Sequence, residues 1–158
     1  MRFIWARVRY RVYGTIRSAN FDHQTVADTP EAFFKTIPMD IRDASSVTKG
    51  VSHILKKEGR IDVVVNNAGI ATAGAIEEVA MKEVQNQFET NFFGAMRVCQ
   101  AVLPQMRNQK SGCIINISSI GDVMGLPFQG AYSASKFAME GMSEALRIEV
   151  KPFGIRVC

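Results

Sequence analysis

The stretch "IDVVVNNAG", residues 61–69, constrains the fold of this chain more than any other part of its sequence. Ile61 and the valines at 63–65 form an almost unbroken apolar series, without the alternation of a half-exposed strand. Such a series is typical of strands that are buried on both faces of a parallel sheet. The polar "NNAG" that follows indicates where this strand ends.

Strand and helix patterns alternate along the rest of the chain. Further strands are expected at "YRVYGTI" (10–16), "AFFKTIPMD" (32–40), "CIINIS" (113–118) and "GIRVC" (154–158), and helices at 43–59, 76–106 and 131–150. The helix residues expected to face the core are Val47, Val51, Ile54, Leu55, Phe137, Met142, Leu146 and Val150. Gly59 stands where the first helix should end. Strands joined by helices imply parallel β-α-β units, so we expect one domain, residues 1–158, built as a doubly wound parallel α/β sheet.

The composition agrees with a folded, non-membrane protein. Of the 158 residues, 47% are hydrophobic and 22% are charged, and no apolar run approaches the length of a membrane span. Cys99, Cys113 and Cys158 are odd in number and lie in no metal-ligand spacing. They suit a reducing compartment, which favours a cytoplasmic protein with buried, unreactive thiols.

The net charge of +4 originates in the N-terminal segment. Arginines at positions 2, 7, 9, 11 and 17 precede the first acidic residue, Asp22, and the rest of the chain is nearly neutral. Basic residues interleaved with aromatic ones allow a nucleic-acid-binding or targeting segment. Both interpretations are disfavoured, because the segment is poor in serine and runs directly into an expected strand.

Polar side chains are expected to converge at the carboxyl ends of the strands, where such sheets bind ligands. Ser119 follows the strand at 113–118, and Tyr132 and Lys136 lie one turn apart at the start of the next helix. An ammonium at ~4 Å lowers the pKa of a phenol from about 10 towards neutrality, which makes a tyrosine a usable acid or base. A serine hydroxyl can stabilise charge on a substrate oxygen. On these residues alone, an ordinary amphipathic helix surface stays open as the alternative.

Several motifs occur together, namely "NNAG" (66–69), "TNFFG" (90–94), "NISS" (116–119) and "YSASKFAMEG" (132–141). In this order and spacing they resemble the short-chain dehydrogenase/reductase family. The stretch "MGLPF" (124–128), followed by "YSASKFAMEGMSEAL", is most similar to members that act on hydroxysteroids, retinol and related lipophilic alcohols. The resemblance implies a Rossmann-type dinucleotide-binding domain and an NAD(P)(H)-dependent oxidoreductase that interconverts an alcohol and its carbonyl by hydride transfer.

The resemblance also implies roles for single residues. Tyr132 is the expected acid and base, Lys136 lowers its pKa and holds the nicotinamide ribose, and Ser119 orients the substrate oxygen. Asn91 is expected to anchor a water in the proton relay, although an asparagine taken alone here is expected on an exposed helix face. The residues expected to contact the cofactor are Asp40, Asn66, Ala68, Gly69, Tyr132 and Lys136. For Gly69 the alternative is a simple turn, and for Asp40 a polar strand end.

Arg17 favours NADP(H) over NAD(H). In this fold an acid after the second family strand accepts the adenosine ribose hydroxyls, whereas an arginine pairs with the 2′-phosphate of NADP. The corresponding strand here ends in Arg17, with Ser18 as a second expected contact. The alternative is a solvated surface arginine.

The family's first strand and its TGxxxGxG turn, which binds the pyrophosphate, match no segment of this sequence. "GIRVC" ends before the family's Pro-Gly turn and substrate lid. We therefore expect a partial chain whose sheet lacks a central strand and which, alone, binds NADPH weakly and is catalytically poor. The alternative is a non-catalytic remnant that associates through its helices. In a complete fold, the helices at 76–106 and 131–150 are expected to pack in a homo-oligomer.

Overall fold

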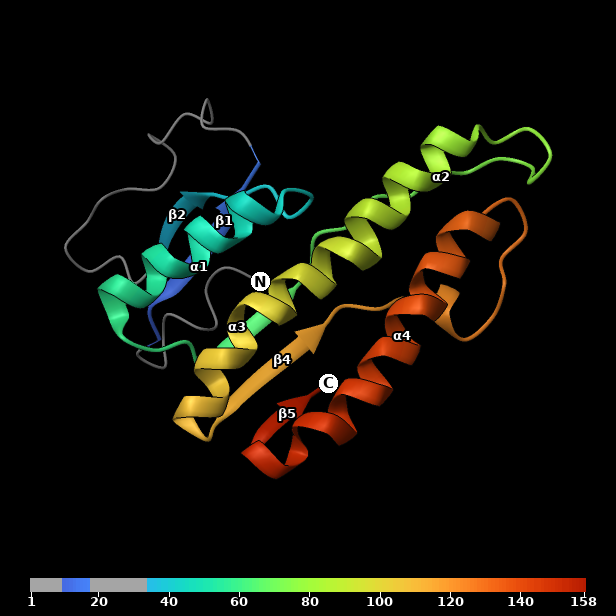
Figure 1. Cartoon of the computed structure of the whole chain (residues 1–158). Helices are drawn as coiled ribbons and strands as arrows, with labels where there is room; N and C mark the ends of the chain where they lie inside the picture. The colour runs from blue at the N-terminus through green and yellow to red at the C-terminus, as the bar shows by residue number, and fades with distance from the viewer. Residues whose placement is uncertain (1–9, 18–33) are drawn as a thin grey trace.

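The structure is a computed structural model that describes residues 10–17 and 34–158, apart from the side chains of Phe34 and Asp122. Strands and helices alternate along the chain as expected (Figure 1). None of the described helices is both long and apolar enough to cross a membrane. In chain order the elements are β1 (Val12–Ile16), β2 (Phe34–Pro38), α1 (Ala44–Glu58), β3 (Val63–Asn66), α2 (Met81–Phe88), the π-helix η3 (Glu89–Gly94), α3 (Ala95–Gln109), β4 (Gly112–Asn116), the 3₁₀-helix η4 (Ile120–Asp122), α4 (Gly130–Val150), the 3₁₀-helix η5 (Lys151–Phe153) and β5 (Ile155–Val157).

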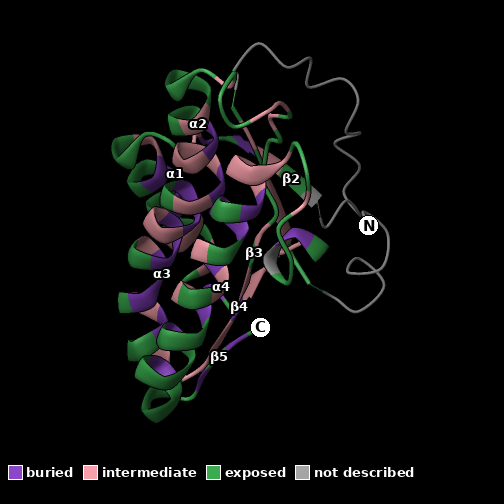
Figure 2. Cartoon of the chain, turned by 90° about the vertical axis from the view of Figure 1, so that its right-hand side faces the viewer, coloured by how far each residue is buried: buried purple, intermediate pink, exposed green. Residues whose placement is uncertain are grey.

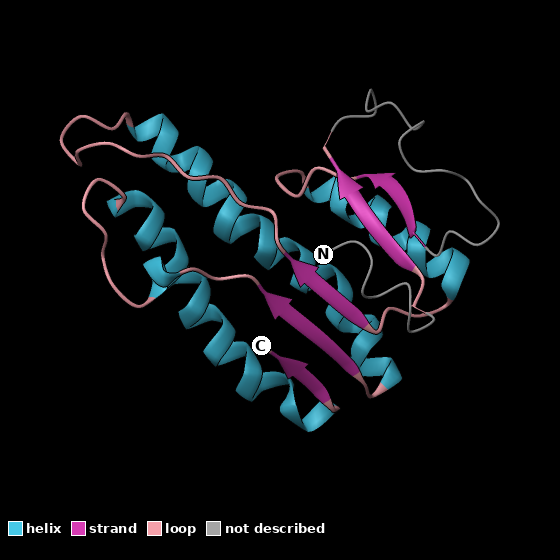
Figure 3. Ribbon diagram, turned by 180° about the vertical axis from the view of Figure 1, so that it is seen from behind, coloured by secondary structure: helices cyan, strands magenta, loops and turns pink. Residues whose placement is uncertain are grey.

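The described strands are all parallel but form two sheets. β1 pairs with β2, and the second sheet has the order β3-β4-β5. Every strand points the same way (Figure 3). No strand among the described residues joins the β1-β2 sheet to the β3-β4-β5 sheet, which agrees with the expectation of an interrupted sheet. The parallel α/β fold predicted from the sequence is confirmed.

The α-helices α1 to α4 lie on one side of the strands (Figures 2 and 3). Val64 faces these helices and packs against the core. Val65 points to the opposite face and is 42% exposed. The prediction that this strand is buried on both faces is therefore wrong at Val65, because no described helix covers the second face.

The core lies between the helices and the strands. α1 contributes Val47 and Val51, against which Ile54 and Leu55 pack, as their spacing predicts. Gly59 ends the helix with a φ of 71°, and its N–H donates to the Leu55 carbonyl. The whole cluster consists of Met39, Val47, Val51, Ile61, Val98, Cys99, Val102, Leu103, Met106, Ile114, Leu146, Val150, Ile155 and Val157.

The thiols are not uniformly buried. Cys99 lies in the core, and burial raises its pKa to about 11. Cys113 is half-buried and Cys158 is exposed. The prediction of buried thiols is therefore correct for Cys99 and wrong for Cys158, which follows β5 at one side of the described three-stranded sheet.

α4 buries a different stripe from the predicted one. Leu146 and Val150 are buried as expected, but Phe137 is 46% exposed. The buried residues in the first half of the helix include Ser133, Ser135, Lys136 and Met139. The spacing of the apolar residues did not predict this stripe, because a polar side chain can be buried when its hydrogen bonds are satisfied inside the protein, as those of Ser135 and Lys136 are.

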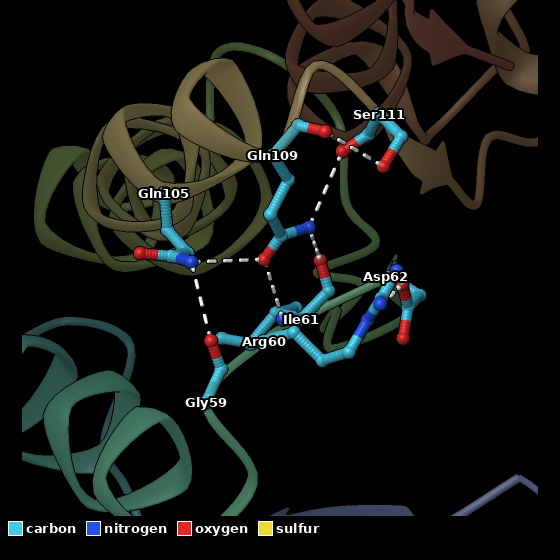
Figure 4. Close-up of polar contacts among 7 residues, drawn as sticks. All are labelled: Gly59, Arg60, Ile61, Asp62, Gln105, Gln109 and Ser111. Carbon is cyan, nitrogen blue, oxygen red and sulfur yellow. Dashed lines mark hydrogen bonds and ion pairs between the residues drawn. The ribbon is translucent and has the colours of Figure 1, made fainter.

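α2, η3 and α3 form one continuous helix from Met81 to Gln109. It starts later than the predicted residue 76, because Ala80 is extended, with a ψ of 134°. At the other end, Gln109 Nε2 donates to the Ile61 carbonyl at 3.0 Å, and its Oε1 accepts from the Ile61 N–H at 3.1 Å (Figure 4). This helix therefore fixes the segment that leads into β3.

Candidate active site

The predicted site residues lie where the strands end. Arg17 and Asp40 follow β1 and β2, Asn66 is the last residue of β3, and Ser119 comes shortly after β4. Because the strands are parallel, these ends share one edge of the two sheets (Figure 3). This is the edge at which open α/β sheets bind their ligands.

Tyr132 and Lys136 are brought together at the start of α4. Lys136 is only 6% exposed. Its Nζ donates to the Ile117 carbonyl at 2.8 Å and lies 5.8 Å from the centre of the Tyr132 ring. Since Ile117 directly follows β4, this bond ties the start of α4 to the end of that strand. The predicted pair thus consists of a buried cation beside a half-buried phenol ring.

Ser119 approaches this pair through the short helix η4. Its Oγ accepts from the Gly121 N–H at 3.3 Å and caps the helix. A Cβ at Gly121 would lie 3.4 Å from two carbons of the Tyr132 ring. The segment that carries Ser119 therefore lies within van der Waals reach of the Tyr132 ring.

Asn91 is buried in η3, where it is 1% exposed. Its Oδ1 accepts from the Ile70 N–H at 2.8 Å, and its Nδ2 donates to the Ile70 carbonyl at 2.9 Å and to Ser135 Oγ at 3.0 Å. The Ser135 hydroxyl in turn donates to the Tyr132 carbonyl at 2.7 Å. The alternative of an exposed helix face is wrong, because the Asn91 side chain is buried. Its bonds connect it to the turn that carries Tyr132.

Ser135 is a site residue that the sequence analysis missed. It is fully buried and joins Asn91 to the first turn of α4. The available signal was its position three residues after Tyr132, from which a serine hydroxyl commonly reaches the backbone carbonyl of the preceding turn.

The Asn66 side chain makes its hydrogen bonds to other side chains of the protein. Its Nδ2 donates to Asn116 Oδ1 at 2.8 Å and lies 3.5 Å from Cys99 Sγ. Asn116 Nδ2 donates to Ser143 Oγ at 2.7 Å. This series of bonds joins the ends of β3 and β4 to α4.

Ala68 and Gly69 are exposed at the edge of the sheet. Gly69 lies beside Asn91, whose Oδ1 would be 3.4 Å from a Cβ at that position. A ligand that approaches this edge would therefore meet the backbone of residues 68 and 69.

Asp40 and Arg17 lie next to each other at the ends of β2 and β1. The hydrogen bond from the Arg42 guanidinium lowers the pKa of Asp40, and the charge of Arg17 acts in the same direction. Arg42 donates from its backbone N–H at 3.0 Å and from its Nη2 at 2.8 Å. Arg17 itself is exposed, and Ser18 lies outside the described residues.

An apolar pocket of about 200 Å³ lies between the segment after β3 and the start of α4. A larger hollow of about 470 Å³, over α2 and η3, contains none of the predicted site residues. The smaller pocket adjoins Tyr132 through Ala131 and has no charged lining. It is lined by Thr72, Gly74, Ile76, Val79, Met81, Val84, Phe128, Gly130 and Ala131.

The residues at this edge fit the two ends of a dinucleotide. The exposed guanidinium of Arg17 suits a phosphate, and the Lys136 ammonium beside Tyr132 suits a ribose hydroxyl. The described residues contain no glycine-rich turn at a helix N-terminus that would hold the pyrophosphate between these ends.

Comparison with known sequences identifies the family. Residues 7–158 match the sequence model of the short chain dehydrogenase family. The 3-ketodihydrosphingosine reductase of Bacteroides thetaiotaomicron is 49% identical over 147 residues, which cover 93% of this chain and 52% of the reductase. Human retinol dehydrogenase 8 is 39% identical over 150 residues, which cover 93% of this chain and 47% of the relative. The chain thus spans about half the length of these curated relatives.

Solved structures agree with this result. A short-chain dehydrogenase from Streptomyces avermitilis has a TM-score of 0.90 and 39% identity, with coverage of 97% of this chain and 56% of that one. ElxO with NADP bound has a TM-score of 0.88 and 28% identity, with coverage of 95% and 62%. The resemblance inferred from the motifs is confirmed: the chain belongs to the short-chain dehydrogenase family.

Proposed function

We propose that the candidate active site interconverts an alcohol and its carbonyl compound, with Tyr132 as the acid and base. The observation that carries this proposal is Lys136, which is 6% exposed and has its Nζ 5.8 Å from the centre of the Tyr132 ring. Burying an ammonium costs several kcal/mol, so an apolar side chain would serve packing better. A role in proton transfer accounts for a charge at this position.

In the direction of reduction, the Ser119 hydroxyl donates a hydrogen bond to the substrate carbonyl oxygen and turns it towards Tyr132. Tyr132 gives its phenol proton to that oxygen. A reduced nicotinamide bound at this edge would supply the hydride to the carbonyl carbon. The Lys136 ammonium stabilises the phenolate that is left. Solvent then returns a proton to Tyr132, and oxidation of the alcohol follows the same steps in reverse.

Asn91 is the proposed anchor of the path by which that proton returns. Its Nδ2 donates one hydrogen bond to the Ile70 carbonyl and one to the Ser135 hydroxyl. The Ser135 hydroxyl donates in turn to the Tyr132 carbonyl. Ile70 is 43% exposed, so its carbonyl lies in a segment that solvent reaches. Asn91 therefore stands between solvent and the turn that carries Tyr132.

The proposed substrate is a lipophilic alcohol or carbonyl compound. The relatives described above include a 3-ketodihydrosphingosine reductase and a retinol dehydrogenase. In this chain the segment between β4 and α4 exposes a group of large apolar side chains, and the apolar pocket of about 200 Å³ lies beside it. Such surfaces suit an apolar substrate body. The exposed side chains are Ile120, Val123, Met124 and Phe128.

The proposed cofactor is NADP(H), because Arg17 offers an exposed cation at the end of β1. ElxO, a structural neighbour, was solved with NADP bound. In the complete protein, Arg17→Asp is expected to reverse the ratio of NADPH to NADH affinities. Arg156→Asp, which changes an exposed arginine on β5, should leave that ratio unchanged. An unchanged ratio in Arg17→Asp would show that the arginine is merely part of the surface.

The complete protein is proposed to be a homo-oligomer that associates through η3 and α4. Phe93 on η3 is 42% exposed and Phe137 on α4 is 46% exposed, and these elements contact each other. Light scattering of the complete protein is expected to give a dimer or a larger species, and a monomer would contradict the proposal.

The test of the reaction uses the chain alone and a chimera in which the chain replaces the matching residues of the B. thetaiotaomicron reductase. NADPH consumption is followed with a long-chain ketone. The chimera is expected to turn over, and Tyr132→Phe to lower turnover by at least about a hundredfold, as loss of a general acid does. Tyr10→Phe is the control. Full activity of Tyr132→Phe would overturn the proposal.

The chain alone is expected to bind NADPH weakly, because it has no glycine-rich turn to receive the pyrophosphate. A loss of about 4 kcal/mol would weaken a micromolar dissociation constant about a thousandfold. Fluorescence titration of the folded chain measures this, and micromolar binding would contradict it.

A further inference from the structure

A buried glutamine near Asn91 has no role in the proposed reaction. Gln87, in α2, is 0% exposed, and its Oε1 accepts from the Thr72 N–H. Its Nε2 has no hydrogen-bond partner among the described residues. A buried donor without a partner is destabilising, and a methionine would fill similar space without that cost. Gln87 therefore requires an explanation beyond packing.

The partner of Gln87 fixes the orientation of its amide. A backbone N–H is only a donor, so the side-chain oxygen must face Thr72 and the nitrogen must point away. The unpartnered nitrogen is thus a consequence of binding Thr72. The bond to Thr72 is what the glutamine provides and a methionine does not.

Gln87 and Asn91 bind alternate residues of one segment. The two side chains are four residues apart on a continuous helix, about 6 Å along its axis. Their partners, Ile70 and Thr72, are two residues apart, about 6.7 Å in an extended chain. These spacings match, so two side-chain amides can bind successive N–H groups on one edge of the segment.

The same edge continues to the start of α4. The next N–H in the series, that of Gly74, donates to the Phe128 carbonyl at 2.8 Å. Ile76 then packs beside Gly130, where a Cβ would lie 2.9 Å from the Ile76 side chain. The segment that Gln87 and Asn91 hold therefore reaches the apolar pocket and the first residue of α4.

We propose that Gln87 is a positioning residue that forms, with Asn91, an amide clamp on residues 70–74. The bond to Thr72 keeps the Ile70 backbone in place on the Asn91 amide, which in turn binds Ser135. Gln109 holds the Ile61 backbone in the same way, so one helix fixes the chain before and after β3. The value of the clamp for catalysis rests on the proposed function, but its existence does not.

Amide hydrogen exchange followed by NMR tests the clamp without any turnover. Gln87→Met removes the acceptor, and Gln85→Met makes the same change at an exposed position of the same helix. In Gln87→Met the exchange of the Thr72 N–H, relative to that of the core residue Ile114, is expected to rise by at least about tenfold. The Asn91 side-chain amide protons should also exchange faster. Gln85→Met should change neither.

A conservative variant separates the clamp from packing. Gln87→Glu keeps an oxygen for Thr72, so the Thr72 N–H is expected to stay protected. If Gln87→Met does not fold, Gln87→Asn, whose amide is too short to reach Thr72, makes the same comparison. Wild-type protection of Thr72 in Gln87→Met or Gln87→Asn would overturn the clamp. Loss of protection at Thr72 with an unchanged Asn91 amide would overturn the positioning role, whether or not the protein is an oxidoreductase.

Discussion

Asn91→Ala removes the side chain that joins the segment after β3 to α4. In the wild-type chain this amide makes three hydrogen bonds, two with the Ile70 backbone and one with Ser135. The Ile70 groups lie in a half-exposed segment, where water can replace the lost bonds. Ser135 is fully buried, but its hydroxyl keeps the bond to the Tyr132 carbonyl. The variant therefore loses bonds without leaving a buried charge.

The expected cost follows from these contacts. A net contribution of about 0.5–1.5 kcal/mol per hydrogen bond gives about 1.5–4.5 kcal/mol for the three bonds. Hydration of Ile70 moves the value towards the lower end, and the cavity left by truncation raises it. Alanine favours the helix by about 0.5 kcal/mol relative to asparagine. We expect the free energy of unfolding to fall by about 2–3 kcal/mol.

Urea denaturation followed by circular dichroism measures this cost. Asn86→Ala is the matched control, because Asn86 is exposed on the same helix and its substitution carries the same gain in helix propensity. The difference between the two variants isolates the bonds of the Asn91 side chain. If the free energy of unfolding of Asn91→Ala is less than about 1 kcal/mol below that of Asn86→Ala, the bonds to Ile70 and Ser135 do not hold the site together.

Two further predictions concern the scaffold. Gly59 and Gly154 both have a φ of 71°, but a Cβ would find open space at Gly59 and would lie 2.5 Å from the Lys110 carbonyl oxygen at Gly154. In urea titrations we expect Gly59→Ala to lower the free energy of unfolding by about 1 kcal/mol, and Gly154→Ala to lower it by at least about 1 kcal/mol more. Equal losses would show that the Lys110 carbonyl does not restrict residue 154. Burial, and then the hydrogen bond to Glu58, raise the pKa of Tyr13 to about 12. The folded state therefore holds the phenol proton more tightly than the unfolded state, and this contribution to stability is complete below the unfolded pKa of about 10 and is lost as pH rises through the folded pKa of about 12. Tyr13→Phe should flatten the fall in the free energy of unfolding between these two pKa values. An unchanged slope of the urea midpoint against pH would contradict this prediction.

Local signals in the sequence predicted much of the fold. Gly59 ends α1 because a left-handed residue suits a helix end, and Val47 and Val51 are buried because they share a face. The meeting of Tyr132 and Lys136 also followed from local structure, since residues four apart are neighbours on a helix.

Other features depend on contacts between distant segments. Val65 is exposed because no described helix covers its face, which an apolar run does not reveal. Asn91 and Gln87 are buried because they bind backbone groups 21 and 15 residues away. A glutamine in a helix carries no local mark of such a partner, so Gln87 was not predicted.

Transfer of a label from cofactor to product tests the proposed reaction most directly. The chimera is supplied with a ketone and with NADPH that carries deuterium at either of the two positions on C4 of the nicotinamide. The product is analysed by mass spectrometry. We predict that one of the two labelled cofactors places one deuterium on the carbon that bears the new hydroxyl, and that Tyr132→Phe forms this product at least about a hundredfold more slowly. A reduced product without label from either cofactor would contradict hydride transfer at this site.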